Sequence, residues 1–327
     1  MKALVCAAYG PIDTLVVKDI PAPVPGPKQL LIEVRSAAVN FPDALMVQGL
    51  YQVKPPLPFT PGAEIAGIVT SVGAEVKHYK AGDRVIALTS TGGFAEECLA
   101  DAARAMPLPA GMDFDTGAAL VLTYCTSLHG LKDCGHLKAG ETLVVLGAAG
   151  GVGIAAIEIG KAMGARVIAA ASADDKLELC KRVGADETVN YSTENLKDRI
   201  NELTGGKGAD VVYDPVGGPY TEPAVRALAW RGRLLIIGFA AGGIPKIPLN
   251  LALLKERSLV GVYWGDSVKH DPAGHLANLH QLHEWFAAGR IKPVVSARFP
   301  LARAADAIAS IANRQVKGKI VVTPQNG

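Results

Sequence analysis

The sequence predicts an α/β protein of two domains, one built on a doubly wound parallel sheet and the other rich in β-strands. The chain has 327 residues, about twice the length of a typical domain. Residues 1–122 contain short apolar runs separated by proline-rich loops, whereas residues 123–264 alternate between strand and helix patterns. The tail, about 265–327, ends in another apolar strand, which we expect to return to the first domain.

The first domain is predicted from three extended apolar runs, at 30–34, 65–73 and 83–88. Prolines are concentrated in two of its connecting segments, which include Pro21, Pro23, Pro25, Pro27, Pro55, Pro56, Pro58 and Pro61. Proline fixes φ and has no backbone N–H to donate, so these segments cannot be helices or central strands. We therefore expect a β-rich domain with long ordered loops.

The second domain is predicted from five nearly continuous apolar runs, at 142–146, 166–171, 210–214, 234–238 and 258–263. Helical patterns intervene, the clearest of them near 153–163 and 176–183. Strands that are apolar on both faces and alternate with helices are typical of a parallel sheet covered on both sides.

Composition excludes several classes of function. Hydrophobic residues make up 49% of the chain and charged residues 20%, and the net charge of +2 gives no sign of a nucleic-acid or anionic-membrane partner. The sequence from Met1 shows no signal-peptide pattern, and no apolar stretch reaches the roughly 18 residues of a membrane helix. The five cysteines are scattered without a Cys-x-x-Cys pair, which favours reduced thiols and a cytoplasmic location.

A glycine-rich turn, Gly147-Ala148-Ala149-Gly150-Gly151-Val152-Gly153, joins the strand 142–146 to the next helix. Glycines there let the backbone approach a pyrophosphate, which the N–H groups and dipole of the helix N-terminus stabilise. Ala148 departs from the dinucleotide motif at its first glycine, but the flanking strands and helix are correctly placed. We predict a Rossmann domain that binds a dinucleotide through Ala149, Gly150, Gly151, Val152 and Gly153.

The end of the second strand in this domain predicts NADPH rather than NADH. NADH sites place an acidic residue there to hold the ribose hydroxyls, and this strand ends without one. A 2′-phosphate favours hydroxyls and cations, which Ser172, Lys176 and Tyr191 offer. The alternative is that Lys176 is a solvated helix residue paired with Asp174 or Asp175.

Further motifs are spread over the whole chain, and they are Asn40-Phe41-x-Asp43, Gly49-Leu50-Tyr51, Pro61-Gly62-Ala63-Glu64-x-x-Gly67, Leu122-Thr123-Tyr124, Asp214-Pro215-Val216-Gly217-Gly218 and Gly318-Lys319-Ile320-Val321. With the glycine turn, they resemble the medium-chain dehydrogenase/reductase superfamily, and within it the zinc-independent quinone oxidoreductase (zeta-crystallin-like) branch. The resemblance implies a GroES-like catalytic domain at both chain ends, a Rossmann domain in the middle and a homodimer.

Two substitutions argue against a catalytic metal. The resemblance places Asn40 and Ala63 where the zinc-dependent alcohol dehydrogenases of this superfamily carry a catalytic cysteine and histidine. Neither an amide nor a methyl group can replace a thiolate or an imidazole on zinc. The four-cysteine structural lobe is also missing. Three other histidines are expected on the solvated face of a helix over 273–286 rather than in a metal site, namely His275, His280 and His283.

Without zinc, delivery of hydride to an electron-poor acceptor is the reaction that needs least assistance. Quinones and α,β-unsaturated carbonyls fit, because the negative charge spreads onto an oxygen that hydrogen bonds stabilise. The resemblance implies that Asn40 and Tyr51 line the acceptor pocket and donate to that oxygen. The alternatives are that Asn40 anchors a turn and that Tyr51 packs in the core. Leu45 stands where relatives often have another tyrosine, which implies a less polar pocket.

The resemblance also implies that Thr123, Gly238 and Phe239 lie near the nicotinamide, and that Arg314 approaches the adenosine phosphate or ribose. Arg314 and Lys319 are equally consistent with ordinary surface cations, and Glu64 is expected to be structural. The leading hypothesis is a reductase of small-molecule quinones or enones that uses NADPH. The alternatives are an enoyl thioester reductase and a non-enzymatic NADPH-binding protein, crystallin-like or RNA-binding. A pI near 8.2 and 6% aromatic residues do not supply the basic, aromatic surface expected of an RNA-binding protein.

Overall fold

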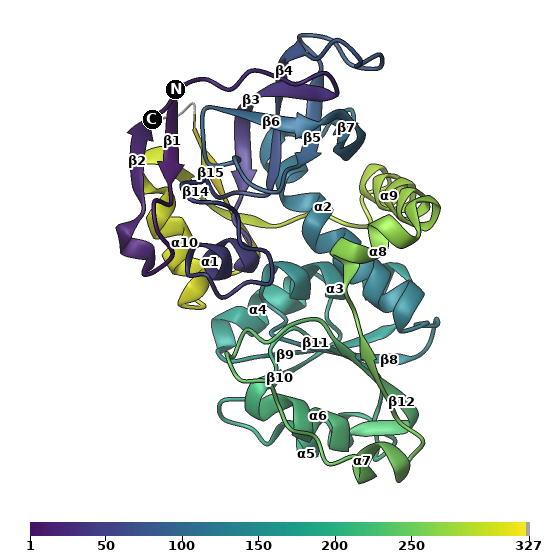
Figure 1. The fold of residues 1–327 in the computed structure, drawn as a ribbon. Coiled ribbons are helices and arrows are strands. Elements are labelled where there is room, and N and C mark those ends of the chain that lie inside the picture. The colour runs from purple at the N-terminus through teal and green to yellow at the C-terminus, as the bar shows by residue number, and fades with distance from the viewer. Residues whose placement is uncertain (325–327) are drawn as a thin grey trace. The chain divides into compact units, whose positions relative to one another are not determined.

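The computed structural model describes residues 1–324 and divides into two compact units (Figure 1). Unit 1 comprises Met1–Leu122 together with the chain from Val294 onward, and unit 2 comprises Thr123–Pro293. The first division therefore falls after residue 122, and the second falls after residue 293 rather than near 265. Over the residues described, no helix is long and apolar enough to cross a membrane.

The assignment of residues 265–293 to the first domain is wrong. They form most of α8 (Trp264–His270) and all of α9 (Pro272–Ala287), which belong to unit 2. Polar side chains bind α9 to the π-helix η3 (His129–Cys134). Asn278 donates to Asp133 at 2.7 Å, and Lys132 donates to Asn278 at 2.9 Å. These contacts join segments nearly 150 residues apart, so sequence order alone could not reveal them.

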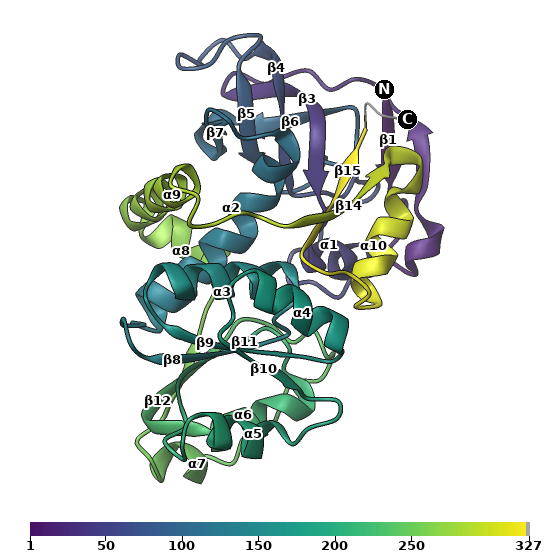
Figure 2. The ribbon, with the colours of Figure 1, turned by 180° about the vertical axis from the view of Figure 1, so that it is seen from behind.

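Unit 2 is built on a parallel sheet whose strand order, over the part of the chain described, is β10-β9-β8-β11-β12-β13. Numbered from β8, this is the 3-2-1-4-5-6 order of a Rossmann sheet. Helices α3 and α4 lie on one side, and α5 and α6 on the other (Figures 1 and 2). The prediction of a doubly wound Rossmann domain is confirmed. Its elements are α2 (Phe114–Leu128, continuing from unit 1), β8 (Thr142–Leu146), α3 (Gly151–Ala162), β9 (Arg166–Ala171), α4 (Asp174–Arg182), β10 (Glu187–Asn190), α5 (Leu196–Leu203), β11 (Ala209–Asp214), η4 (Gly218–Tyr220), α6 (Thr221–Arg226), β12 (Leu228–Ile236), α7 (Asn250–Leu253) and β13 (Ser258–Gly261).

Unit 1 contains a mainly antiparallel sheet. Its order across the described residues is β14-β15-β3-β4-β5-β7, with β6 also paired to β3, and a separate ribbon joins β1 to β2. The last strand, β15, pairs with β3 through Val321 and Ala38, so the end of the chain returns to the first domain. Its elements are β1 (Lys2–Val5), η1 (Ile12–Thr14), β2 (Val16–Asp19), β3 (Gln29–Ala38), α1 (Phe41–Val47), β4 (Glu64–Val72), β5 (Arg84–Leu88), β6 (Glu97–Asp101), η2 (Ala102–Arg104), β7 (Ala105–Pro107), β14 (Val295–Pro300), η5 (Leu301–Arg303), α10 (Ala304–Ala312) and β15 (Lys319–Thr323).

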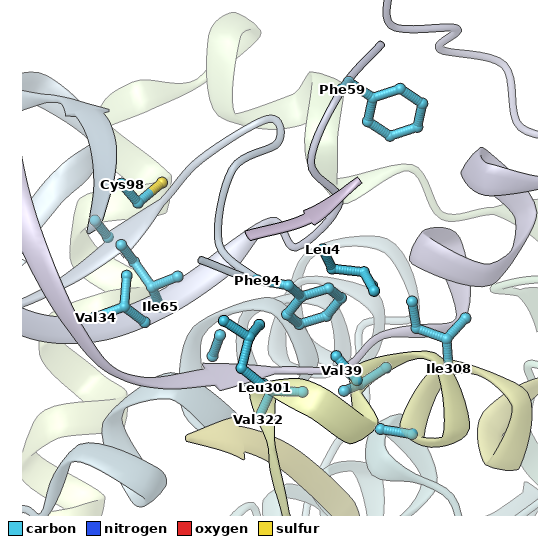
Figure 3. Packing of buried hydrophobic residues seen from close by; sticks show 14 of the residues in the cluster. Leu4, Val34, Val39, Phe59, Ile65, Phe94, Cys98, Leu301, Ile308 and Val322 are labelled. Carbon is cyan, nitrogen blue, oxygen red and sulfur yellow. The ribbon is translucent and has the colours of Figure 1, made fainter. Parts of the chain in front are cut away.

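The core of unit 1 is made by both ends of the chain. Leu4, Val34 and Phe94 come from the N-terminal segment, and Leu301 and Val322 from the C-terminal segment. Figure 3 shows these side chains packed in one cluster, and all are almost wholly buried. Burying a large aliphatic side chain contributes roughly 1.5–3 kcal/mol, so the C-terminal segment is part of this core and not an appendage to it.

Candidate functional site

The glycine turn of unit 2 is tightened by Gly147, one residue earlier than the motif places its first glycine. Gly147 has φ of 56°, in the left-handed region that glycine adopts without strain. The N–H of Ala148 donates to Ala170 at 3.0 Å, and the N–H of Gly150 donates back to Gly147 at 3.0 Å. The turn therefore tolerates Ala148, because its tight bend does not depend on that residue.

The two remaining motif glycines meet different surroundings. A Cβ at Gly153 would lie 2.5 Å from the carbonyl oxygen of Gly147 and 2.6 Å from that of Ala148, closer than any real side chain approaches. A Cβ at Gly150 would meet just one described atom within 4 Å, the Gly147 oxygen at 3.3 Å. Gly153 is thus required because the backbone of the turn passes directly against it, whereas the position of a Cβ at Gly150 is open apart from the Gly147 oxygen.

The N-terminus of α3 fits a pyrophosphate. Its N-cap is Gly150, and among the residues described no side chain caps it and no acidic residue lies in its first turn. The first N–H groups of a helix need acceptors from outside the helix, and its dipole favours an anion. An uncapped helix end beside an open glycine is the arrangement that a dinucleotide phosphate requires.

The residues predicted for the 2′-phosphate gather at one edge of the sheet. Strands β9 and β10 pair in parallel with Ala171 opposite Asn190, so Ser172 and Tyr191 follow side by side. The hydroxyl of Ser192 donates to the Ser172 carbonyl at 3.0 Å, which holds the two strand ends together. Lys176 lies in the first turn of α4, four residues after Ser172, with Asp174 and Asp175 between it and the N-cap residue.

One carboxylate beside this edge is already engaged. Asn190 donates from its side-chain amide to Asp174 at 2.7 Å. Asp174 therefore has a hydrogen-bond partner on the neighbouring strand, but a neutral amide does not cancel its charge, so the alternative in which Asp174 or Asp175 pairs with Lys176 stays open. The edge combines hydroxyls with a lysine, and Asp174 points its oxygen toward Asn190.

The residues predicted near the nicotinamide follow the next strands of the same sheet. Asp214, at the end of β11, accepts the N–H groups of Val216 and Gly217 at 2.9 Å each and the hydroxyl of Thr221 at 2.6 Å, which fixes the loop. Gly238 donates to the Asp214 carbonyl at 3.4 Å. Phe239 is 37% exposed. The carboxyl ends of the strands therefore carry this group as well, where ligands bind in open α/β sheets. Thr123 is buried in α2.

In unit 1, Asn40 is held by a buried polar network. Its Nδ2 donates to Glu64 at 3.2 Å and to the Ala38 carbonyl at 3.5 Å, and its Oδ1 accepts from Lys319 Nζ at 2.5 Å. Its backbone N–H donates to Asp43 at 2.8 Å as part of a capping box that begins α1. The anchoring role that the sequence left open for Asn40 is therefore present in the structure.

The network contains two carboxylates and one ammonium, all buried. Lys319 Nζ lies 3.6 Å from Glu64, whose other oxygen accepts the N–H of Leu122 at 2.7 Å. Burial raises the pKa of Asp43 to about 7 and raises the pKa of Glu64, while it lowers the pKa of Lys319. Lys319 is thus no surface cation, and Glu64 has the structural role expected of it.

Tyr51 and Arg314 also lie in unit 1. Tyr51 follows α1 and is half-buried against the hydrophobic core, as its packing alternative anticipates. Arg314 follows α10, is exposed and has φ of 57°. The structure thus places the proposed cofactor residues of unit 2, apart from Thr123 in α2, at the carboxyl ends of its strands, whereas Asn40, Tyr51 and Arg314 belong to unit 1.

The sequence interpretation missed Asp43 and Lys319 as members of the Asn40 network. The spacing of Asn40 and Asp43 is that of a capping box, which could have been recognised. Lys319 lies 279 residues from Asn40 along the chain, so no local signal connects them.

The histidines of α9 only partly follow the prediction of a solvated face. His280 is exposed, but His275 and His283 are half-buried, and the nitrogens His275 Nδ1 and His283 Nε2 have no hydrogen-bond partner in the described structure. Burial lowers the pKa of both residues. Throughout residues 1–324, no group of three or more His, Cys, Asp or Glu side chains is arranged to hold a metal ion.

Family models match both units, residues 26–112 the alcohol dehydrogenase GroES-like domain and residues 151–281 the zinc-binding dehydrogenase domain. A Rossmann sheet with its glycine turn and a GroES-like domain define an oxidoreductase of the medium-chain dehydrogenase/reductase class. The chain belongs to the quinone oxidoreductase branch of that superfamily, which confirms the resemblance seen in its motifs.

Three similar proteins support this assignment. The quinone oxidoreductase-like protein 2 homolog of Nematostella vectensis is 40% identical over 91% of this chain and 82% of its own length. The quinone oxidoreductase of Pseudomonas aeruginosa is 36% identical over 99% of both chains. The crystal structure of Escherichia coli quinone oxidoreductase complexed with NADPH has a TM-score of 0.91 and 29% identity, covering 99% of this chain and 100% of the other.

Proposed function

We propose that this protein is an NADPH-dependent reductase of quinones or α,β-unsaturated carbonyls that works without zinc. The observation that carries the proposal is the uncapped N-terminus of α3, with the open face of Gly150, next to a strand end that offers Ser172, Lys176 and Tyr191 instead of a carboxylate. The NADPH complex of the similar Escherichia coli enzyme supports the same cofactor. When bound, NADPH supplies the hydride, and the chain's own residues hold the phosphates and stabilise the charge on the acceptor oxygen.

The direct test is oxidation of NADPH by the purified protein across a panel of quinones, enones and enoyl thioesters. We expect turnover with the first two groups and a preference for NADPH over NADH. Turnover confined to enoyl thioesters would instead identify an enoyl reductase. Tight binding of NADPH without turnover of any acceptor would identify a nucleotide-binding protein.

Independence from zinc is supported by the chemistry of the Asn40 network. Where a zinc site would need thiolate and imidazole donors, the chain has an amide and the methyl group of Ala63. The ammonium of Lys319, 2.5 Å from the Asn40 oxygen and 3.6 Å from Glu64, already provides a positive charge there. A divalent cation at the same place would have to displace the ammonium that Glu64 already pairs with. Elemental analysis that finds one zinc per chain, with activity lost to a chelator, would overturn this part of the proposal.

For the acceptor, we propose that Tyr51 donates its hydroxyl to the carbonyl oxygen and that Asn40 supplies a second donor. One Asn40 amide hydrogen points to Glu64, while the other makes a 3.5 Å contact with Ala38 at the weak limit of hydrogen bonding. Exchanging that contact for the acceptor oxygen sacrifices little. Tyr51→Phe should reduce kcat by on the order of a hundredfold with NADPH affinity unchanged. Asn40→Ala should slow turnover as well, but it also removes three network bonds and should lower the melting temperature.

We further propose a homodimer and a cytoplasmic location. Strand β13 ends the sheet of unit 2, and exposed apolar side chains gather in the segments before and after it, at Ile244, Leu249, Leu253, Leu254 and Tyr263. Such a surface favours a protein partner. A monomeric mass in solution by light scattering would contradict the dimer.

All five cysteines lie in the described part of the chain and are free thiols, which supports a reducing compartment.

A further inference from the structure

A cysteine, a histidine and an aspartate form a hydrogen-bonded chain on the π-helix η3. The Nε2 of His129 lies 3.4 Å from the sulfur of Cys134, and its Nδ1 lies 2.9 Å from Asp133. The π-helix makes this arrangement possible, because the N–H of Gly135 donates to Gly130, five residues back, at 2.8 Å. The wider turn brings residues five apart onto one face, where an α-helix would separate the imidazole from the thiol.

The outer end of this chain is also held in place. Asn278 of α9 donates to the same oxygen of Asp133 at 2.7 Å, and Lys132 in turn donates to Asn278 at 2.9 Å. The hydrogen bond to Cys134, together with Asp133, raises the pKa of His129 to about 9 against the effect of burial. A base held by a third group beside a nucleophile is the general arrangement of an activated side chain, and a protonated imidazole stabilises a thiolate next to it.

Cys134 is also the least buried cysteine of the described chain. It is half-buried, whereas the other cysteines, all without disulfides, are buried, namely Cys6, Cys98, Cys125 and Cys180. Burial raises the pKa of each of Cys6, Cys98 and Cys180, which suppresses their reactivity. The three-residue chain contains no arrangement for a metal ion within the described residues. The hydrogen-bonded order of Cys134, His129 and Asp133 is that of a nucleophile, its base and the group that orients the base.

We propose that Cys134 is a nucleophilic thiol that adds covalently to conjugated carbon electrophiles, with His129 as its base and Asp133 as the residue that orients His129. In the reacting pair the thiol proton is held on Nε2 of His129, and the thiolate electron pair of Cys134 forms a bond to the β-carbon of an enone or quinone. The π electrons of the C=C bond move toward the carbonyl oxygen, and the proton from His129 ends on the α-carbon. The addition consumes no oxidant or reductant. The expectation that such electrophiles reach the protein rests on the proposed function. The reactivity of the thiol is independent of that function.

The test labels the full-length protein at pH 7 with a limiting amount of N-ethylmaleimide and, separately, of methyl vinyl ketone. Peptide mass spectrometry then locates the adducts, with glutathione as the reference thiol. We expect Cys134 to carry the adduct with both reagents and to react on the order of tenfold faster than glutathione. Labelling of Cys134 no faster than glutathione, or first labelling of a buried cysteine, would overturn the proposal without any variant.

Two variants test the roles of the neighbours. His129→Gln should slow labelling of Cys134 by on the order of tenfold, and Asp133→Asn by a smaller factor. The matched control is His136→Asn, since His136 is exposed, lies two residues from Cys134 and has φ of 47°, which asparagine tolerates. Equal rates in His129→Gln and this control would overturn the role of His129. Selective labelling of Cys134 in a protein without reductase activity would reject the proposed function while retaining this inference.

Discussion

Unit 1 and unit 2 prepare their functional residues by opposite means. In unit 2, the glycine turn leaves backbone N–H groups at the start of α3 for an anion, and its essential residues are distinguished by having no side chain. In unit 1, Asn40 is fixed by charged side chains from β4 and β15 and by its own helix α1. The anion site of unit 2 is made by residues close in sequence and contains no charged side chain. The Asn40 network of unit 1 joins residues distant in sequence, and it is ionic and buried.

The two regions differ in which property of the protein a substitution weakens, stability or ligand affinity. A buried ion pair that loses one member leaves an uncompensated charge, so the penalty falls on the stability of the whole unit. A site made of backbone N–H groups contains no charged side chain that could be left unpaired. A substitution there therefore weakens ligand binding, and it lowers stability only if the new side chain also collides with the backbone. Substitutions in the two regions should therefore separate stability from cofactor affinity.

The largest effect is expected for Lys319→Met. It removes the ammonium that lies 3.6 Å from Glu64 and 2.5 Å from the Asn40 oxygen, and leaves the buried acids Glu64 and Asp43 without a cation. The free energy of unfolding should fall by about 3–5 kcal/mol. Urea unfolding measures it, with Lys77→Met as the control, because Lys77 is exposed and its loss should change stability by less than about 0.5 kcal/mol. Equal stability of the two variants would mean that the network does not hold unit 1 together.

The pH dependence of stability sharpens the same side of the comparison. Burial raises the pKa of Asp43 from 3.8 to about 7, so between these values the unfolded chain gives up this proton while the folded chain keeps it. The stability that Asp43 provides is therefore complete below about pH 4 and is lost as the pH rises through 7. Asp43→Asn should remove up to about 1.4 kcal/mol per pH unit of that slope. Parallel slopes in wild type and variant from pH 4 to 7 would show that Asp43 ionises in its ordinary range.

In unit 2, Gly153→Ala and Gly150→Ala form a matched pair. The new Cβ at Gly153 would collide with backbone oxygens at 2.5 and 2.6 Å, and we expect a loss of about 1–3 kcal/mol in stability as well as weaker NADPH binding. At Gly150 the Gly147 carbonyl oxygen lies 3.3 Å away, a tight contact that a small shift relieves, so the loss of stability should be smaller than at Gly153 while NADPH affinity falls. Thermal melts and direct NADPH titration separate the two effects. If Gly150→Ala bound NADPH as tightly as wild type, the phosphates would lie elsewhere.

The sequence supports prediction of unit 2 much better than of unit 1. The strands and the glycine turn of unit 2 are contiguous patterns, and even the irregular Ala148 is explained by Gly147 within the same turn. The Asn40 network joins residues 24 and 279 positions apart, and a local pattern cannot encode such a pairing. The same reason underlies the error at residues 265–293, since α9 is assigned to unit 2 by contacts with η3 that depend on three-dimensional packing.

The smallest effect expected is a change of cofactor preference in Lys176→Glu. Lys176 lies in the first turn of α4, four residues after Ser172, which forms an edge with Tyr191. A lysine there would make a charge-assisted contact with a 2′-phosphate, and a glutamate would repel it. Each interaction is worth roughly 1–3 kcal/mol, so the ratio of NADPH to NADH affinity should fall by at least about tenfold.

Lys181→Glu is the matched control, because it makes the same change of charge in the last turn of the same helix, on an exposed residue. NADH carries no 2′-phosphate, so its affinity should be nearly equal in both variants and the wild type. Fluorescence titrations with the two nucleotides give the ratio directly, and they should be repeated at higher salt, where a contact between exposed charges weakens. If Lys176→Glu and Lys181→Glu change the ratio equally, Lys176 contributes only to the general field of the surface. The preference for NADPH would then have to come from the hydroxyls of Ser172 and Tyr191.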